Sequence, residues 1–249
     1  MRDRLDPPAA VALDVPDLAG ARRLLDALGG MVPVFKVGLE LFTAEGPAAV
    51  REVIDRGAEV FLDLKLNDIP KTVAGGVRSA GRLGVKYLTV HSGAGRAAIE
   101  AAVSEASDLR ILVVSVLTSL GDDELAELGI RRSAADQVDA MADLAASSGA
   151  PGLVLAAGEA ARVRSRHPDL FLVTPGIRPS SHEARCLEPD GSRQRKTLKD
   201  GDDQRRTGTP AAAIAAGSDM LVLARSVCDV PDPRAALEGV LREIERVPS

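Results

Sequence analysis

The sequence predicts a single α/β domain folded as a (β/α)8 TIM barrel, and three observations support this. The chain has 249 residues, close to the roughly 250 that such a barrel takes. Short strand-like runs alternate with helical patterns along the whole chain. Charged side chains stand at the ends of many of these runs, where barrel enzymes place their chemistry. An open, doubly wound sheet shares the alternation and stays as the alternative.

The first half of the chain is expected to supply strands one to four. Asp17 is the predicted N-cap of the first helix, which should end at Gly29-Gly30. Pro47 after Gly46 should bend or restart the second helix. The expected strands are 9–14, 34–38, 58–64 and 86–91, and the expected helices after the first are 40–56, 70–83 and 94–105.

The second half repeats the pattern with one interruption. Residues 110–117 are nearly continuous in aliphatic side chains, as expected of a strand buried on both faces. Further strands are expected at 152–156, 171–174 and 218–224, and helices at 122–128, 133–148, 159–166 and 232–246. An extended charged loop at about 180–207, after the seventh strand, has no clear periodicity. A loop of this length and place favours a lid.

The composition excludes several classes of protein. Hydrophobic residues make up 45% of the chain and aromatic residues 2%, so the core must be largely aliphatic. A net charge of −5 with mixed signs argues against a nucleic-acid partner. The chain shows no signal peptide and no apolar run of about 18 residues, so we expect a cytoplasmic protein without a membrane partner. Cys186 and Cys228 have no metal or redox spacing and are interpreted as free thiols.

The stretch 61–72 carries the strongest functional signal. Its first residues alternate, so that an aliphatic face packs on helices while Asp63 and Lys65, about 6.6 Å apart along a strand, share the other face. Asp68 follows in a short loop, and Pro70 is expected at the first helical position. A structural salt bridge or a solvated loop would be the non-functional interpretation.

Other predicted strands also end in polar or charged residues, while the opposite, amino ends of the strands are expected to lack charged groups. Each such residue has an ordinary explanation, as a cap, a lysine reaching water or a structural histidine, but their convergence favours a site. They are Asp14, Lys36, His91, Thr118, Arg178 and Arg225.

The chemistry open to these residues is limited. The sequence has no Cys/His metal cluster, no His-Glu-x-x-His motif, no nucleophile elbow and no dinucleotide fingerprint, so neither a metal nor another cofactor is expected. Basic groups after strands seven and eight suit a phosphate monoester. A lysine between carboxylates keeps its charge, which suits a proton donor or carbanion stabiliser rather than a Schiff base.

In this pattern the sequence resembles the orotidine 5′-phosphate decarboxylase family over nearly its whole length. The Asp-x-Lys-x-x-Asp core occurs also in sister decarboxylases and aldolases of sugar phosphates, but the ordered set of motifs is far more specific. That set is Val11-Ala-Leu-Asp14, Lys36-Val-Gly38, residues 61–72, Val116-Leu-Thr118, residues 174–179, Asp203-Gln-Arg-Arg206 and Ala224-Arg225.

The resemblance implies a cofactor-free decarboxylation of orotidine 5′-phosphate (OMP) to UMP, with a role for each matched residue. Lys65 would give a proton to C6 of the pyrimidine, Asp63 would face the leaving carboxylate, and Lys36 would hold the charged groups and touch the ribose. Asp14 would bind a ribose hydroxyl and Thr118 the pyrimidine. Arg178, Gln204, Arg225 and the backbone N–H of Ala224 would hold the phosphate.

The resemblance also implies an assembly. Asp68 and Thr72 would reach into the site of a neighbouring subunit, so a homodimer with shared active sites is expected.

Two departures from the family pattern have physical consequences. The family usually has glycine where this chain has Ala224, and a position that needs positive φ would strain alanine. The loop 180–203 is also longer than the family pattern, by an insertion that includes residues 186–199.

Two alternatives remain at this stage. A metal-dependent sugar-phosphate decarboxylase or aldolase on the same barrel would typically have an acidic metal ligand where Lys36 stands. A non-catalytic sensor of nucleotide phosphates would keep the pocket without turnover.

Overall fold

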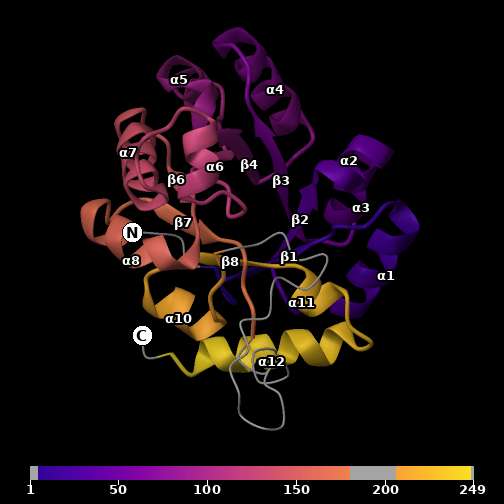
Figure 1. Ribbon diagram of the computed structural model, residues 1–249. Coiled ribbons are helices and arrows are strands. Elements are labelled where there is room, and N and C mark those ends of the chain that lie inside the picture. The colour runs from indigo at the N-terminus through magenta and orange to yellow at the C-terminus, as the bar shows by residue number, and fades with distance from the viewer. Residues whose placement is uncertain (1–4, 180–205, 248–249) are drawn as a thin grey trace, which may run out of the picture.

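The computed structural model describes residues 5–179 and 206–247, and in them parallel strands close into a barrel (Figure 1). β1 (Ala9–Ala12) pairs with both β2 (Val34–Gly38) and β8 (Met220–Leu223), which closes the sheet. Between them lie β3 (Glu59–Leu66), β4 (Tyr87–His91), β5 (Arg110–Val114), β6 (Gly152–Val154) and β7 (Phe171–Thr174). The closure confirms the predicted TIM barrel and excludes the open doubly wound sheet.

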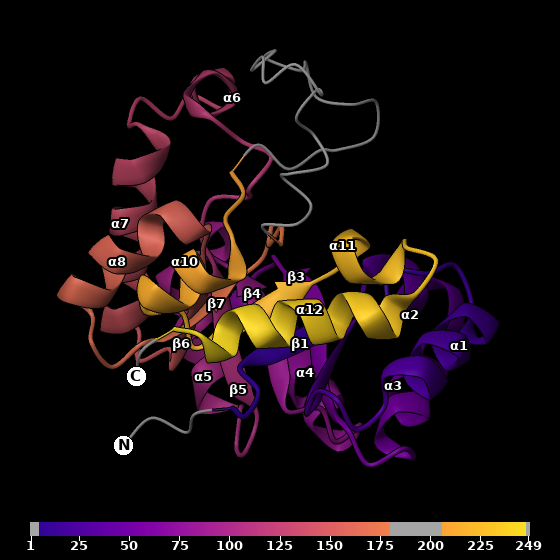
Figure 2. The ribbon, with the colours of Figure 1, turned by 90° about the horizontal axis from the view of Figure 1, so that it is seen from below.

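Helices surround the barrel, as the two views in Figures 1 and 2 show together. Most lie where the sequence predicts them, and the second predicted helix restarts at Gly46-Pro47 as expected. They are α1 (Leu18–Leu28), α2 (Leu39–Glu45), α3 (Pro47–Ile54), α4 (Pro70–Arg82), α5 (Arg96–Ser104), α6 (Asp122–Glu127), α7 (Ala134–Ser147), α8 (Ala157–Arg166), α10 (Pro210–Ala215), α11 (Arg225–Cys228), α12 (Pro233–Glu245) and the 3-10 turn η1 (Ser92–Ala94).

Local sequence explains the ends of these helices. The Asp17 carboxylate accepts the N–H of Gly20 at 2.7 Å and so caps α1, as predicted. Pro70 occupies the first turn of α4, where its missing N–H costs nothing. The short helices α10 and α11, of 6 and 4 residues, were not predicted.

The barrel interior is a packed core, not a channel. Phe61, Tyr87 and Phe171 meet inside it, with ring centroids 6.2 and 6.0 Å apart, and the guanidinium of Arg110 lies 4.6 Å from the Phe171 ring centre. On β3 the alternate residues Val60 and Leu62 face the helices, as predicted. Since the interior is filled, only the rim at the strand ends has room for chemistry.

Several predicted boundaries were wrong by a few residues. β1 and β5 end at Ala12 and Val114, short of the predicted residues 14 and 117, because the chain leaves the sheet there to form the rim. β3 instead runs on to Leu66, with a shift of register against β4 between Leu62 and Leu66. The predicted charged loop lies mostly outside the described residues, and Gln204 and Cys186 lie outside them too.

In the described ranges, no helix combines the length and the apolar character that crossing a bilayer requires.

Candidate active site

Four charged residues form a lysine–aspartate array (Asp14, Lys36, Asp63 and Lys65) at the carboxyl ends of β1, β2 and β3. Lys36 Nζ donates to Asp14 Oδ1 at 2.8 Å and lies 3.8 Å from Asp63 Oδ2. Lys65 Nζ donates to the same Asp63 oxygen at 2.8 Å. The charges therefore alternate along the array, and Asp63 lies between two ammonium groups.

Strand register explains why these residues meet. Ala12 pairs with Lys36 and Gly38 with Asp63, so side chains of one layer point into the barrel mouth from neighbouring strands. Gly38 is required for close approach, because a Cβ there would lie 2.9 Å from Lys36 Nζ and 3.0 Å from Asp14 Oδ1. The predicted motif Lys36-Val-Gly38 thus has a steric reason.

The backbone of Lys65 is strained. Its φ is +49°, in the left-handed region that a residue with a long side chain rarely adopts. The register shift between β3 and β4 falls at the same place. This bulge turns Lys65 back toward Asp63, a feature that the simple strand alternation did not predict.

Thr89 on β4 connects these features and was missed in the sequence. Its fully buried hydroxyl donates to Asp63 Oδ1 at 2.9 Å and accepts the backbone N–H of Lys65 at 2.8 Å. The hydroxyl thus takes the place of a ladder acceptor at the bulge. The sequence did contain a signal for Thr89. It is a polar residue two positions before His91, on the same inward-facing side of the strand.

Asp63 is held as a carboxylate. Burial by itself would raise its pKa, but the charges of Lys36 and Lys65 and the hydrogen bonds from Lys65 and Thr89 outweigh burial, and the pKa lies below its ordinary value. The Lys65 side chain stays 33% exposed, so its ammonium group can face a ligand at the rim.

His91 and Cys228 flank the array without joining it. Burial, and then the charge of Lys65, lower the pKa of His91, whose Nδ1 accepts the N–H of Gly93 at 3.0 Å. Burial, and then the nearby carboxylates of Asp14 and Asp229, raise the pKa of Cys228 to about 12. The prediction of a free thiol is confirmed for Cys228.

Asp68 and Thr72 lie apart from the array. Both are exposed, and the Asp68 carboxylate accepts the N–H of Ile69 at 2.6 Å. Among the described residues, neither side chain has a hydrogen bond or ion pair to the array. Ile69 between them is 67% exposed, and Leu39, which follows β2, is 55% exposed. The segment that carries Asp68 and Thr72 thus also exposes an apolar side chain.

The predicted phosphate residues follow β7 and β8. Arg178 is held through its backbone N–H, which donates to Gly208 O at 2.9 Å. Ser226 Oγ donates to Ile177 O at 3.2 Å, which joins the two loops. Ala224 has φ −130°, so the left-handed strain considered for this alanine is absent, and Arg225 begins α11 immediately after it. Thr118 lies in the loop after β5.

A metal centre has little support in the described part of the chain. It contains no group of three or more His, Cys, Asp and Glu side chains that could hold an ion. Within the array, the ammonium groups of Lys36 and Lys65 occupy the positions beside Asp63 where a cation would otherwise bind.

Comparisons with known proteins show which family this chain resembles. The model of the orotidine 5′-phosphate decarboxylase / HUMPS family matches residues 7–240. Relatives named orotidine 5′-phosphate decarboxylase from Moorella thermoacetica and Thermobifida fusca are each 44% identical, the first over 95% of this chain and 92% of its own, the second over 96% of both.

A solved structure is also similar. The crystal structure of orotidine 5′-phosphate decarboxylase from Lactobacillus acidophilus has a TM-score of 0.78 and 31% identity, and the match covers 97% of this chain and 99% of that one. With the family model matching nearly the whole chain, this protein belongs to the orotidine 5′-phosphate decarboxylase / HUMPS family.

Proposed function

We propose that this chain is an orotidine 5′-phosphate decarboxylase, a carboxy-lyase that converts OMP to UMP and CO2 in de novo pyrimidine synthesis. The observation that carries the proposal is the alternating array, in which Asp63 lies between Lys36 and Lys65 at the barrel mouth. The names of the relatives support the same reaction.

The array suits the chemistry of this reaction. When the bond between C6 and the carboxylate breaks, the electron pair stays on C6 and CO2 leaves. The Lys65 ammonium faces the developing negative charge and then transfers a proton to C6. Asp63 and Lys36 hold Lys65 in place, so the charges are organised before the substrate arrives. No further cofactor takes part.

The magnitudes decide which interaction dominates. Enzymes lower barriers by about 8–23 kcal/mol, and forming a vinyl carbanion should need the upper end. Repulsion between Asp63 and a substrate carboxylate about 4 Å away is worth about 4 kcal/mol at an effective dielectric constant of about 20. Repulsion is therefore a minor contribution. Stabilisation of the carbanion by Lys65 in a water-poor site supplies the larger share.

The remaining residues bind the substrate. Asp14 takes a ribose hydroxyl and Thr118 the pyrimidine. The phosphate is held by Arg178, Gln204, Arg225 and the N–H of Ala224. Contacts to this remote group supply binding energy for closing the site.

The working unit in this proposal is a cytoplasmic homodimer of single-domain barrels. Asp68 and Thr72 complete the site of the neighbouring subunit. Their exposure supports this, and so do the exposed side chains of Ile69 and Leu39, because exposed apolar surface is commonly covered in assemblies. Sedimentation of the purified chain tests it, and a monomer at working concentration contradicts it.

The deciding experiment follows the orotate absorbance band after OMP is added to the purified protein, with and without a chelator. Equal loss in both samples supports cofactor-free decarboxylation. Loss that the chelator abolishes supports the metal-dependent sister reaction and removes the role given to Lys36. UMP binding without any loss of absorbance supports the non-catalytic sensor.

A further inference from the structure

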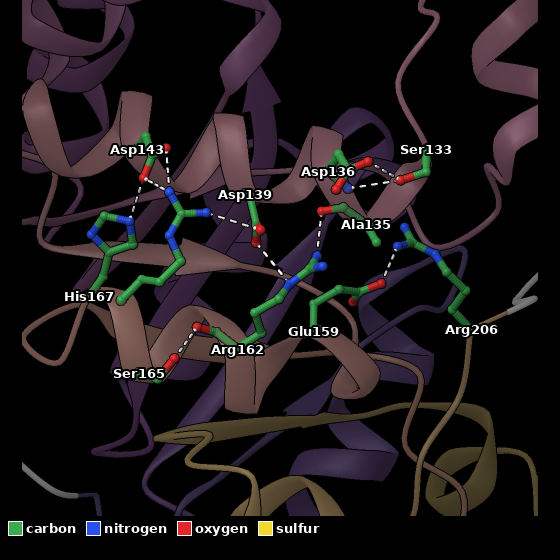
Figure 3. Close-up of polar contacts among 11 residues, drawn as sticks. Ser133, Ala135, Asp136, Asp139, Asp143, Glu159, Arg162, Ser165, His167 and Arg206 are labelled. Atoms are coloured by element: carbon green, nitrogen blue, oxygen red, sulfur yellow. Dashed lines mark hydrogen bonds and ion pairs between the residues drawn. The ribbon is translucent and has the colours of Figure 1, made fainter.

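The segment that returns from the charged loop is tied to the barrel rim by Arg206, which the proposed mechanism does not use. Arg206 Nη1 forms an ion pair with Glu159 Oε1 in the first turn of α8 (Figure 3). Its Nη2 donates to Val116 O at 2.9 Å and Leu117 O at 3.0 Å, in the loop after β5. One guanidinium thus connects the loop after β5, the start of α8 after β6, and the segment that follows β7.

The ion pair is more buried than a surface pair. The side chains of Arg206 and Glu159 are 19% and 10% exposed. In the described structure, Arg206 Nε and Glu159 Oε2 are buried without a hydrogen-bond partner. Burying charges with incomplete pairing is unfavourable for stability, so stability alone is a weak reason for this arrangement.

The chain beside Arg206 is fixed as well. Ile177 and Gly208 form a parallel bridge, and Gly208 exchanges backbone hydrogen bonds with Gly176 and Arg178, at 3.2 and 2.9 Å. Gly208 also packs closely on α8, since a Cβ there would lie 2.5 Å from Ala157 Cβ. The two ends of the charged loop are therefore joined at their base.

These contacts connect the two ends of the substrate site. Arg178, assigned to the phosphate, is bonded to Gly208, two residues after Arg206. Thr118, assigned to the pyrimidine, directly follows Leu117, whose carbonyl Arg206 holds. Arg206 thus links the loop assigned to the phosphate with the loop assigned to the pyrimidine, and it helps to set the distance between them.

We propose that Arg206, held by Glu159, is a positioning residue that sets the phosphate-binding loop in register with the pyrimidine-binding loop. The proposal rests on the proposed function for its assignment of Arg178 and Thr118. Arg206 touches no reacting atom. With Arg206 in place, one nucleotide can contact both loops at the same time. Binding of the phosphate then helps to place the base.

The test compares a whole ligand with its two halves. Inhibition or binding constants are measured for UMP, uridine and ribose 5-phosphate with the full-length Arg206→Met variant. Each half should bind as it does to the unsubstituted chain, because each loop keeps its own contacts. UMP should bind about ten- to a hundred-fold more weakly, and kcat/KM for OMP should fall with it.

Two further variants separate geometry from charge. Arg206→Lys keeps the charge but lacks the planar fork, so it should show most of the loss. Glu159→Gln keeps an acceptor for Arg206 and should show a smaller loss in the same direction. This milder variant keeps the proposal testable if Arg206→Met does not fold.

Arg162 is a matched control. It also bonds a carboxylate, Asp139, and a backbone carbonyl, Ala135 O, but within the described residues these contacts join α7 and α8 and reach no substrate loop (Figure 3). Arg162→Met should lower the melting temperature without changing the ratio of the three binding constants.

Three results would overturn the proposal: unchanged UMP affinity in Arg206→Met, losses for UMP that merely match those of the halves, or the same change in Arg162→Met. Decarboxylation by the unsubstituted chain is followed separately. If the unsubstituted chain does not decarboxylate OMP, the proposed function is wrong. The three binding constants still show whether Arg206 aligns the two loops.

Discussion

The two ends of the barrel each hold a group of paired charges, and the two groups are built differently. At the amino ends of β7 and β8, Arg164 bonds Asp219 and donates to the carbonyls of Pro168, Leu170 and Gly217 at 2.7–3.1 Å. Asp219 accepts the N–H of Leu172 at 2.8 Å. The fixed fork of Arg164 is thus met largely by backbone acceptors.

At the carboxyl ends, the array uses lysines in place of arginine. Among the described residues, Lys65 Nζ has a single hydrogen bond, to Asp63, although an ammonium group has three donors. Its backbone is also strained, whereas no residue of the Arg164 pair has positive φ. The comparison indicates that a pair with satisfied donors stabilises the fold, while a pair with spare donors is available to a ligand.

Removing Lys65 tests the comparison most strongly. Lys65→Ala should lower kcat for OMP decarboxylation by about 10⁴-fold or more, because it removes both the proton donor and the charge facing the carbanion. The melting temperature should change little. Turnover near that of the unsubstituted chain would contradict the role of Lys65.

Removing Arg164 should have the opposite pattern. Arg164→Met removes the cation that pairs with the buried Asp219, which should cost about 3–5 kcal/mol of unfolding free energy in denaturant titrations. Activity per folded molecule should be kept.

Arg166→Met provides the control for Arg164, because its pairs with Asp139 and Asp143 are more exposed and should contribute less than about 1 kcal/mol. Equal losses of stability in the two variants would show that the amino-end pair has no special part in the fold.

Thr89 decides how the array is held, and its hydroxyl can be removed with little change of shape. Thr89→Val should lower kcat about ten- to a hundred-fold, since a hydrogen bond to a charged group is worth about 1.5–3 kcal/mol. Thr89→Ser keeps the hydroxyl and should stay near the unsubstituted rate. A serine variant as slow as the valine variant would point to packing instead.

The smallest effect concerns the pH dependence of stability. The pKa of His91 is lowered from its ordinary 6.5 in the folded chain, so the unfolded chain takes up a proton first as pH falls. Stability is then lost below about pH 6.5, down to the folded pKa of His91. His91→Asn should lose less stability between about pH 7.5 and 5.5 in thermal melts, and an unchanged slope would exclude His91 as the cause.

The expectation that the amino ends of the strands lack charged groups was wrong. Arg110 and Asp219 lie there, and both are engaged with the core or the backbone. Charge at a strand end is therefore no sign of a site by itself. The array differs through strain at Lys65 and spare donors on its lysines, neither of which the sequence displays.

The sequence by itself determined the alternation of strands and helices, most helix positions and the residues of the array. This was possible because strand alternation and helical period are local properties, and because parallel strands bring their carboxyl ends to one rim. Tertiary structure alone decided the closure of β1 on β8, the bulge at Lys65, the part of Thr89 and the contacts of Arg206. Each of these joins residues far apart in the chain, and such pairings depend on packing rather than on local periodicity.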